Sequence, residues 1–290
     1  MRFSPTKLVL GAMFCLVLGC VAGCHSKEQP TPLKSGTVRS SSYDTTHVHL
    51  ALMPTADCFP FYYAKLSGIY EKLGLNLDIH TYDGQLDCDT ALRGKWMDGG
   101  YADVQRLKSF HKNLQIVSYG KDHWALFVAG YLRVRQVTHL DQRLVAIARN
   151  SSENVWLDEL LSNARLKVDN VFHIQVNNVN LRAEMLAHRQ IDAAMLRWPY
   201  TACAFSNGDK VLALQDRAAS NACFVVNPRR HGGTKLDKKA LMVLRKGYAM
   251  AVDSIRLRRT NVVKNVLTND YGLPADVADT VKLEFGGFFR

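Results

Sequence analysis

Alternating runs of apolar and polar residues predict strands and helices in turn from His47 onward. Residues 47–54, "HVHLALMP", alternate apolar and polar positions up to a proline, which is typical of a strand. Residues 62–73 repeat apolar positions at helical spacing until Gly74 ends the helix, and residues 75–79 alternate again. The connection is long enough to make the two strands parallel.

A second series of the same kind begins at the predicted strand "RLVAIA", residues 143–148. Ser151 or Ser152 is a candidate N-cap for the helix that follows. A strand, a helix and a further strand then come in the same order as in the first series. The chain therefore shows an internal repeat of strand and helix.

Counting residues supports this repeat. "LRGKWMDGG", residues 92–100, aligns with "LAHRQIDAA", residues 186–194, at an offset of 94 residues. The matched pairs include Lys95 with Arg189, Met97 with Ile191, and Asp98 with Asp192. We predict two similar α/β lobes. Ligands of open parallel sheets bind beyond the carboxyl ends of the strands, so two facing lobes would form a cleft.

The N-terminus has the pattern of a signal peptide. Arg2 and Lys7 precede the apolar run "LVLGAMFCLVLG", and the small-residue stretch "VAGC" follows it. The run is shorter than the roughly 20 residues that a membrane span needs, so a plain N-terminal anchor is the less favoured alternative. We expect residues 1–23 to be removed and the remainder to be exported.

The tetrapeptide "VAGC" resembles a bacterial lipobox, which implies that Cys24 carries a lipid. Cys20 is a weaker candidate, because the residue beside its preceding glycine is a bulky leucine. Residues 24–46 are rich in Ser, Thr and Pro without apolar periodicity, which predicts a flexible tether.

The chain carries a formal net charge of +11, and residues 225–265 hold eleven basic residues against two acids. Such a cluster would normally suggest nucleic acid, but the predicted export argues against that partner. We favour a solvated basic helical face over a surface that contacts anionic lipid or a membrane partner.

Five segments carry a family resemblance, in order along the chain from His47. They are "VHLALMPTADCFPFYYAKLSGIYEKLGLNLDI", "LRGKWMDGGYADV", "LVAIARNSSENVWLDELL", "LRAEMLAHRQIDAAMLRWPY" and "CFVVNPRR". The pattern resembles the solute-binding proteins of ABC importers in the sulfonate, nitrate and thiamine-precursor group. The resemblance implies a type II periplasmic-binding fold: two α/β lobes around a ligand cleft, with the hinge crossed twice, near residues 117–129 and 222–227.

The implied domains are lobe one, residues 47–118 plus 224–290, and lobe two, residues 119–223. The resemblance also implies a monomer without cofactor that closes on a small molecule and docks on an ABC permease, anchored by lipid in the periplasm or at the cell surface. Two alternatives are an enzyme on the same fold, of the thiamine-pyrimidine or menaquinone pathway type, and a surface lipoprotein without an importer. The favoured interpretation, a solute-binding protein, predicts no catalytic residues.

The family's cleft positions map onto loops at the predicted strand ends. They are Thr55, Asp57, Cys58, Gln85, Asp87, Tyr101, Asp103, Asn150, Ser151, Ser152, Trp198 and Tyr200. "RWPY" departs from the family pattern, because an acid often precedes this proline.

The mapped positions suit a cationic or pyrimidine-like ligand, because they offer carboxylates and aromatic faces. Asp89 lies beside the mapped acids, and Trp124 is a further aromatic candidate. A sulfonate or nitrate would instead use the helix N-terminus at residues 150–152. Asp57 and Asp87 are equally explained as helix caps.

Four cysteines follow the tether: Cys58, Cys88, Cys203 and Cys223. An oxidising compartment favours bridges, and we predict Cys58–Cys88 and Cys203–Cys223, with four buried thiols as the alternative. A catalytic Cys58 is disfavoured because no motif places a histidine as its base. His47 and His49 share one strand face, but without a third ligand at recognisable spacing we predict no metal site.

Overall fold

The computed structural model describes residues 47–110, 114–121, 123–215, 221–228, 236–257, 261–283 and 287–289. The predicted signal peptide, lipidated Cys24 and tether lie outside the described residues. Within these ranges, no helix combines the length and the apolar character needed to cross a membrane.

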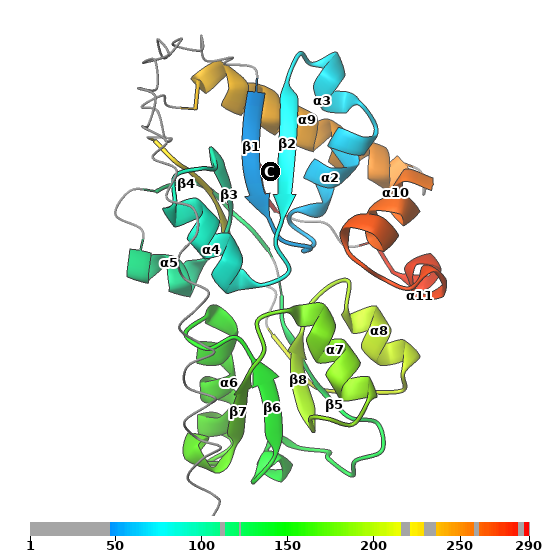
Figure 1. Cartoon of the computed structure of the whole chain (residues 1–290). Coiled ribbons are helices and arrows are strands. Elements are labelled where there is room, and N and C mark those ends of the chain that lie inside the picture. Colours follow the sequence, from blue (N-terminus) through cyan, green and yellow to red (C-terminus); the bar gives the residue numbers. More distant parts are fainter. Residues whose placement is uncertain are drawn as a thin grey trace, which may run out of the picture. The chain divides into compact units, whose positions relative to one another are not determined.

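The first lobe is built on a five-stranded sheet with the strand order β2-β1-β3-β10-β4 (Figure 1). Its strands are β1 (His47–Leu52), β2 (Asn76–Thr81), β3 (Gly99–Asp103), β4 (Gln115–Tyr119) and β10 (Ala222–Val226). β1 runs parallel to β2 and β3, as the long connections require, whereas β10 is antiparallel to β3 and β4.

The second lobe repeats this arrangement in the order β7-β6-β8-β5-β9. Its strands are β5 (Ala125–Val128), β6 (Leu144–Ile147), β7 (Phe172–Gln175), β8 (Ala193–Leu196) and β9 (Lys210–Leu214). β6 is parallel to β7 and β8, and β5 is antiparallel to β8 and β9. The prediction of two similar α/β lobes of the periplasmic-binding type is confirmed.

Helices connect and cover these strands. In the first lobe they are α2 (Phe59–Leu66), α3 (Ile69–Lys72), α4 (Gln85–Arg93), α5 (Val104–Phe110), α9 (Lys238–Leu257), α10 (Asn261–Asn265), the π-helical η5 (Val266–Asp270) and α11 (Ala275–Thr280). The second lobe has η3 (Val137–Leu140), α6 (Ser152–Asn163), η4 (Val168–Asn170), α7 (Val179–Ala187) and α8 (Thr201–Ser206). Ser151 and Asn178 cap α6 and α7 through their side chains, as their sequence positions favour.

The long helix α9 is amphipathic. Leu244, Tyr248 and Val252 are buried at helical spacing, and the helix packs against α2 and α3. Its basic residues Arg245 and Lys246 are exposed. Part of the positive charge of the chain thus lies on a solvated helical face.

A pair of aspartates holds equivalent strands of the two lobes, β1 and β6, in the same way. The carboxylate of Asp98 accepts a hydrogen bond from the His49 N–H, and its own N–H donates to the His49 carbonyl. Asp192 makes both bonds with Leu144. The matched Lys95 and Arg189 both have positive φ, 61° and 59°, just after a helix. The repeat predicted from the sequence is thus carried by equivalent hydrogen bonds.

The chain passes from the first sheet to the second between Tyr119 and Ala125, and back between Leu214 and Ala222. The two crossings are bonded to each other, because Gln215 N–H donates to the Trp124 carbonyl and the Trp124 N–H donates to the Gln215 side chain. The domain limits predicted from the sequence fall inside β4 and β10, and both strands lie wholly in the first sheet.

Asp57 fixes the first crossing to the start of α2. Its carboxylate, which is fully buried, accepts hydrogen bonds from the N–H of Lys121 at 2.8 Å and of Gly287 at 2.7 Å. Gly120 passes so close that a Cβ there would lie 2.0 Å from the Asp57 Oδ2 atom. The acid therefore ties together a helix start, a lobe crossing and the C-terminal segment.

We expect Asp57→Ala to lower the free energy of unfolding by about 2–4 kcal/mol, because two N–H groups lose a charged acceptor. Urea unfolding of the full-length protein, followed by circular dichroism, measures this loss. Asp87→Ala is the control: this acid is exposed in the first turn of α4, so its removal should cost below about 1 kcal/mol. Equal losses in the two variants would contradict the role given to Asp57.

Candidate ligand-binding site

A small pocket lies where strand ends of both lobes meet. Met53 follows β1, Asp103 ends β3, Ala148 follows β6 and Arg197 follows β8, and all four line it. The empty space is about 230 Å³ when open solvent at its mouth is included, and about 10 Å³ of it admits the centre of a water-sized molecule. The other lining residues are Gln85, Trp124, Ser151, Glu153, Asn177, Val179 and Arg182. This is the position at which open α/β sheets bind ligands.

Asp103 joins the first lobe to the second at this pocket. Both of its carboxylate oxygens lie 3.1 Å from the N–H of Ser152, in the first turn of α6. One of them also accepts from the Arg106 N–H at 2.9 Å. The acid thus occupies donor positions that the α6 N-terminus would offer to an anion. Burial raises the pKa of Asp103 to about 6, although the N–H groups of Arg106 and Ser152 act in the opposite direction.

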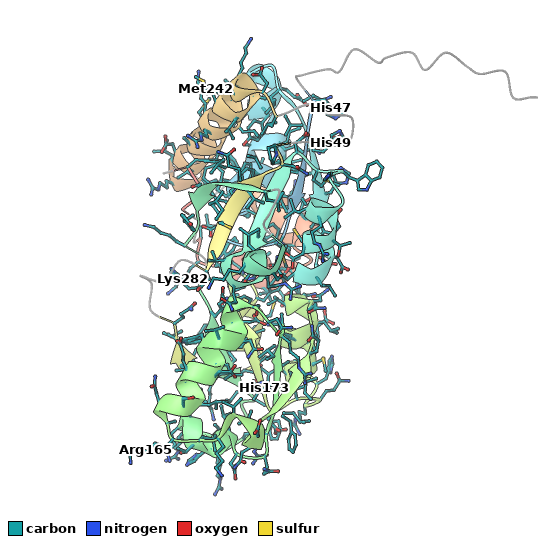
Figure 2. All side chains as sticks on the ribbon, turned by 90° about the vertical axis from the view of Figure 1, so that its left-hand side faces the viewer. His47, His49, Arg165, His173, Met242 and Lys282 are labelled. Atoms are coloured by element: carbon teal, nitrogen blue, oxygen red, sulfur yellow. The ribbon has the colours of Figure 1, made fainter. Side chains whose placement is uncertain are left out.

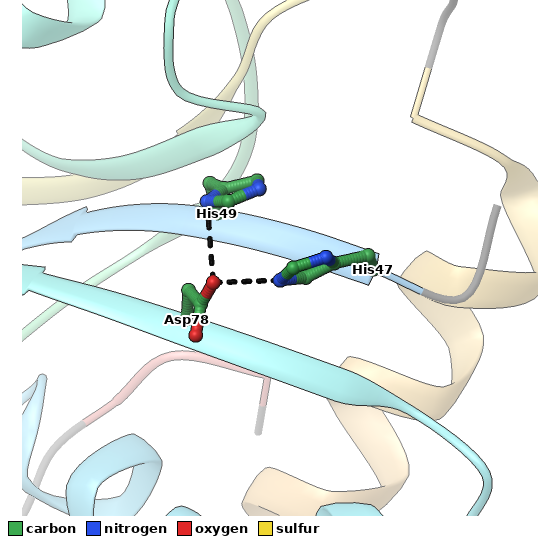
Figure 3. Close-up of side chains that lie close together, drawn as sticks. All are labelled: His47, His49 and Asp78. Atoms are coloured by element: carbon green, nitrogen blue, oxygen red, sulfur yellow. Dashed lines mark hydrogen bonds and ion pairs between the residues drawn. The ribbon is translucent and has the colours of Figure 1, made fainter. Parts of the chain in front are cut away.

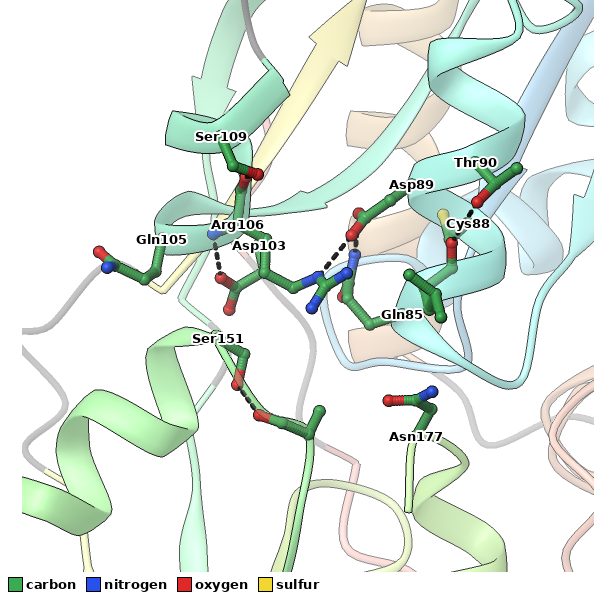
Figure 4. Close-up of polar contacts among 12 residues, drawn as sticks. Gln85, Cys88, Asp89, Thr90, Asp103, Gln105, Arg106, Ser109, Ser151 and Asn177 are labelled. Carbon is green, nitrogen blue, oxygen red and sulfur yellow. Dashed lines mark hydrogen bonds and ion pairs between the residues drawn. The ribbon is translucent and has the colours of Figure 1, made fainter. Parts of the chain in front are cut away.

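A polar network supports Asp103 from the first lobe (Figure 4). The Gln85 side-chain amide donates to Asp89, which also pairs with Arg106. Arg106 in turn donates to the Arg149 carbonyl of the second lobe at 3.0 Å. Burial raises the pKa of Asp89, and the hydrogen bonds from Arg106 and Gln85 oppose this shift. These contacts orient Gln85 and Asp103 at the pocket wall.

A buried ion pair forms the wall of the second lobe. Arg182 pairs with Glu153 at 2.8 Å, and both side chains are almost completely inaccessible. The guanidinium also donates to the carbonyls of Val176 and Met195, while Glu153 accepts from the Ala148 N–H. The pair is fully hydrogen-bonded, as burial of charge requires, and contributes no net charge to the pocket.

Arg197 brings a second guanidinium to the pocket and connects the lobes. It donates to the Tyr101 hydroxyl at 2.7 Å and lies over the Trp124 ring, 4.6 Å from its centroid. A further contact reaches the sulfur of Met53 in the first lobe. An arginine held over an aromatic ring and hydrogen-bonded at one nitrogen presents its remaining donors in a restricted direction.

The structure brings three of the twelve predicted ligand residues to the pocket lining: Gln85, Asp103 and Ser151. Ser152 contacts the pocket through Asp103, and Tyr101 lies behind Arg197. Asp87 and Asn150 are exposed and do not line it.

The three predicted ligand residues of the loop before α2 make hydrogen bonds within the protein and do not face the pocket. Asp57 holds the crossing described above, and the Thr55 hydroxyl accepts from the N–H of Cys58, which is the N-cap residue of α2. The Thr55 carbonyl accepts from the hydroxyl of Tyr271. None of the three lines the pocket.

Trp198 and Tyr200 point away from the pocket, toward the C-terminal part of the chain. The Trp198 indole donates to the Lys282 carbonyl, and its ring packs edge-on against Phe59 and Tyr271. The hydroxyl of Tyr200 donates to the Tyr271 carbonyl. These aromatic residues join α8 to the C-terminal helices.

The predicted disulfides are wrong: Cys58, Cys88, Cys203 and Cys223 are buried thiols with no bridge between them. Cys88 donates to the carbonyls of Ala51 and Tyr101 instead. Cys203 belongs to α8 of the second lobe, whereas Cys223 lies in β10 of the first sheet and donates to the Ala102 carbonyl. The alternative of four buried thiols is what the structure has.

Sequence reasoning missed Glu153, Arg182 and Arg197. Arg197 directly follows the run "IDAAML", so its place after a buried strand was a usable signal. Glu153 and Arg182 lie in helices, and no spacing in the sequence indicates that they pair.

Two lobes of equivalent strand order, with a polar pocket between their strand ends, define a periplasmic-binding-protein-like fold. The chain belongs to the NMT1/THI5-like family, whose model matches residues 55–207. No curated protein matches it.

Solved structures share the fold. The alkanesulfonate-binding protein SsuA from Xanthomonas axonopodis pv. citri, bound to MOPS, has a TM-score of 0.66 at 16% identity, covering 81% of this chain and 82% of that one. The aliphatic sulphonate-binding protein SsuA from Escherichia coli has 0.62 at 17%, covering 83% and 85%. The nitrate-binding protein NrtA from Synechocystis has 0.62 at 11%, covering 81% and 69%.

Asp103 predicts a dependence of stability on pH. Its pKa rises from 3.8, the value expected for the unfolded chain, to about 6. Between these pH values the folded protein keeps a proton that the unfolded chain has lost. The free energy of unfolding therefore falls as pH rises from about 4 to about 6, by up to about 3 kcal/mol, and stays lower above this range.

Asp103→Asn removes this titration, so its stability relative to the wild type should increase across the same window. Urea unfolding at a series of pH values from 4 to 7 measures the difference. Parallel curves for the two proteins would contradict the raised pKa.

Proposed function

We propose that the protein captures a small polar ring compound in this pocket and delivers it to the permease of an ABC importer. The observation that carries the proposal is a pocket walled from both lobes, by Gln85 and Asp103 on one side and Ser151 and Arg197 on the other. The similar structures, described as alkanesulfonate-, sulphonate- and nitrate-binding proteins, support the binding role.

The polar groups of the pocket favour a ligand with both a donor and an acceptor. Arg197 offers only donors, and the Asp103 carboxylate offers only acceptors when ionised. Glu153 and Arg182 cancel each other, so one positive and one negative group remain. A pyrimidine-like heterocycle meets both, and its ring can stack beside Trp124. A simple cation is less suited, because it would meet Asp103 but would also lie beside the positive charge of Arg197.

An anion of the sulfonate or nitrate type is the second candidate ligand. It is favoured by the positive charge of Arg197 in the pocket lining. The N–H of Ser152, which was expected to hold such an anion, already donates to Asp103. An anion would therefore have to bind Arg197 or replace the Asp103 carboxylate.

The contacts that cross the pocket support binding by lobe closure. Asp103 and Arg197 each bond to the opposite lobe, so separation of the lobes would break both contacts and expose the pocket. A ligand that bridges the lobes would favour the closed arrangement by its extra contacts there.

Catalysis by cysteine is disfavoured within the described residues. Burial raises the pKa of the Cys88 thiol well above its usual range, that of Cys203 to about 11 and that of Cys223 to about 12. Thiols with such pKa values are protonated at neutral pH and make poor nucleophiles. Cys58 is fully buried and does not line the pocket. We therefore propose a binding protein without catalytic function.

We further propose that the protein is an exported monomer held at a membrane by a lipid on Cys24, with residues 24–46 as its tether. The signal peptide pattern and the "VAGC" motif support this location.

The ligand is tested by native mass spectrometry of the full-length protein purified in detergent. We expect a co-purifying small molecule, and we expect Arg197→Gln to lower its affinity by about tenfold or more through loss of a charged donor. Arg189→Gln is the matched control: Arg189 also lies over an aromatic ring, Tyr131, but at the surface.

Unchanged ligand occupancy in Arg197→Gln would contradict the pocket as the binding site. The same loss in Arg189→Gln would show that the effect is not specific to the pocket.

The anchor is tested by the substitution Cys24→Ala. We expect it to abolish the mass increase from lipid and to move the protein from the membrane to the soluble fraction on cell fractionation, because the lipid supplies the membrane affinity. Cys20→Ala should leave both unchanged. If the Cys24→Ala protein stayed at the membrane and carried a lipid on Cys20, Cys20 and not Cys24 would be the lipidated residue.

A further inference from the structure

Two histidines and an aspartate, His47, His49 and Asp78, gather on one face of the first sheet. Figure 2 labels the two histidines. His47 and His49 alternate along β1, and Asp78 of β2 pairs with His49 in the parallel register. Residues at these positions project from the same face of the sheet. His80, two residues after Asp78, shares that face.

The polar atoms of this cluster converge (Figure 3). The Nε2 atom of His47 lies 2.6 Å from Asp78 Oδ2, and the Nδ1 atom of His49 lies 3.6 Å from the same oxygen. The Nε2 atom of His80 lies 3.4 Å from the Nδ1 atom of His49. The three ligand atoms of His47, His49 and Asp78 all lie within 4.8 Å of one another.

These separations resemble those inside a metal coordination shell. Zn²⁺ binds imidazole nitrogen and carboxylate oxygen at about 2.0–2.2 Å in a tetrahedron, which places ligand atoms about 3.3–3.6 Å apart. Two of the separations fall in this range, and the short His47 to Asp78 contact has to lengthen by less than about 1 Å to reach it. An ion at the centre would replace the proton that now joins these two residues.

We propose that His47, His49 and Asp78 bind Zn²⁺. His80, whose Nε2 atom lies 3.4 Å from His49 but outside the group that converges within 4.8 Å, has to turn toward the ion to become the fourth ligand. Imidazole with one carboxylate suits Zn²⁺, whereas Mg²⁺ and Ca²⁺ prefer a shell of oxygen atoms. The site is open to an arriving ion, because the side chains of His47, His49 and Asp78 are 34%, 22% and 43% exposed.

One nearby cation has to be accommodated. The ammonium group of Lys65 lies 3.9 Å from Asp78, but it contacts Oδ1 rather than the Oδ2 atom that faces the histidines. Its side chain is 46% exposed and can turn into solvent when an ion binds. The lysine therefore leaves the coordinating oxygen accessible.

The site is distinct from the ligand pocket. His49 lies four residues before Met53, so a strand rise of about 3.3 Å per residue separates it from the pocket lining by about 13 Å. The ion would join β1 to β2, which is the edge strand of the first sheet. Its effect is to brace the strand that the predicted tether leads into, independently of the captured ligand.

The test is a titration of full-length, chelator-treated protein in detergent with Co²⁺, whose visible absorption is intense in a tetrahedral site, followed by displacement with Zn²⁺. We expect one ion per chain and a higher melting temperature with Zn²⁺ but not with Mg²⁺. His49→Gln and Asp78→Asn should each weaken binding by at least about tenfold. Far-UV circular dichroism verifies that both variants are folded.

His139→Gln is the matched control, because His139 is an exposed histidine elsewhere on the second lobe. It should bind Co²⁺ and Zn²⁺ as the wild type does. Wild-type affinity and stoichiometry in both His49→Gln and Asp78→Asn would overturn the site. An equal loss in His139→Gln would also overturn it, since the binding would then be non-specific.

Discussion

One buried carboxylate sets the path of the chain between the lobes. Asp57 accepts from the N–H groups of Lys121 and Gly287, so the helix that follows β1, the first crossing and the C-terminal segment meet at one acid. Gly120 has no room for a side chain at this point. The crossing leads directly into β5, which pairs with β8. Arg197 is the residue that follows β8. The position of the second lobe's pocket groups thus depends on this contact.

The charge of the pocket is balanced by its own residues. Two arginines and two acids line it, and Glu153 and Arg182 satisfy each other within the second lobe. Asp103 and Arg197 instead make their contacts across the lobes, to Ser152 and Tyr101. For a ligand bound in this pocket, selection would rest on the direction of hydrogen bonds more than on net charge, since a buried group without a partner is costly.

The sequence predicted the fold well because periodicity and the repeat reflect backbone geometry. Asp98 and Asp192, matched by counting, make the same two hydrogen bonds in their lobes. The site was predicted less well. Strand ends indicate which loops approach the pocket, but not which side chain faces it: Asp103 does, while Asp57 turns to a segment 64 residues further along the chain.

No metal site was predicted from the sequence, because His47 and His49 have no third ligand at recognisable spacing along the chain. Asp78 and His80, which lie beside them in the structure, come from the neighbouring strand β2.

The bond between Asp103 and the start of α6 has a thermodynamic consequence. A ligand that reaches the Ser152 N–H has to take the place of a carboxylate already bound there, so capture at this point is an exchange of partners and not the filling of a vacant donor. Its measured affinity reports the difference between two acceptors. A ligand at this position would therefore compete with the protein's own Asp103 carboxylate, and a weaker acceptor would not displace it.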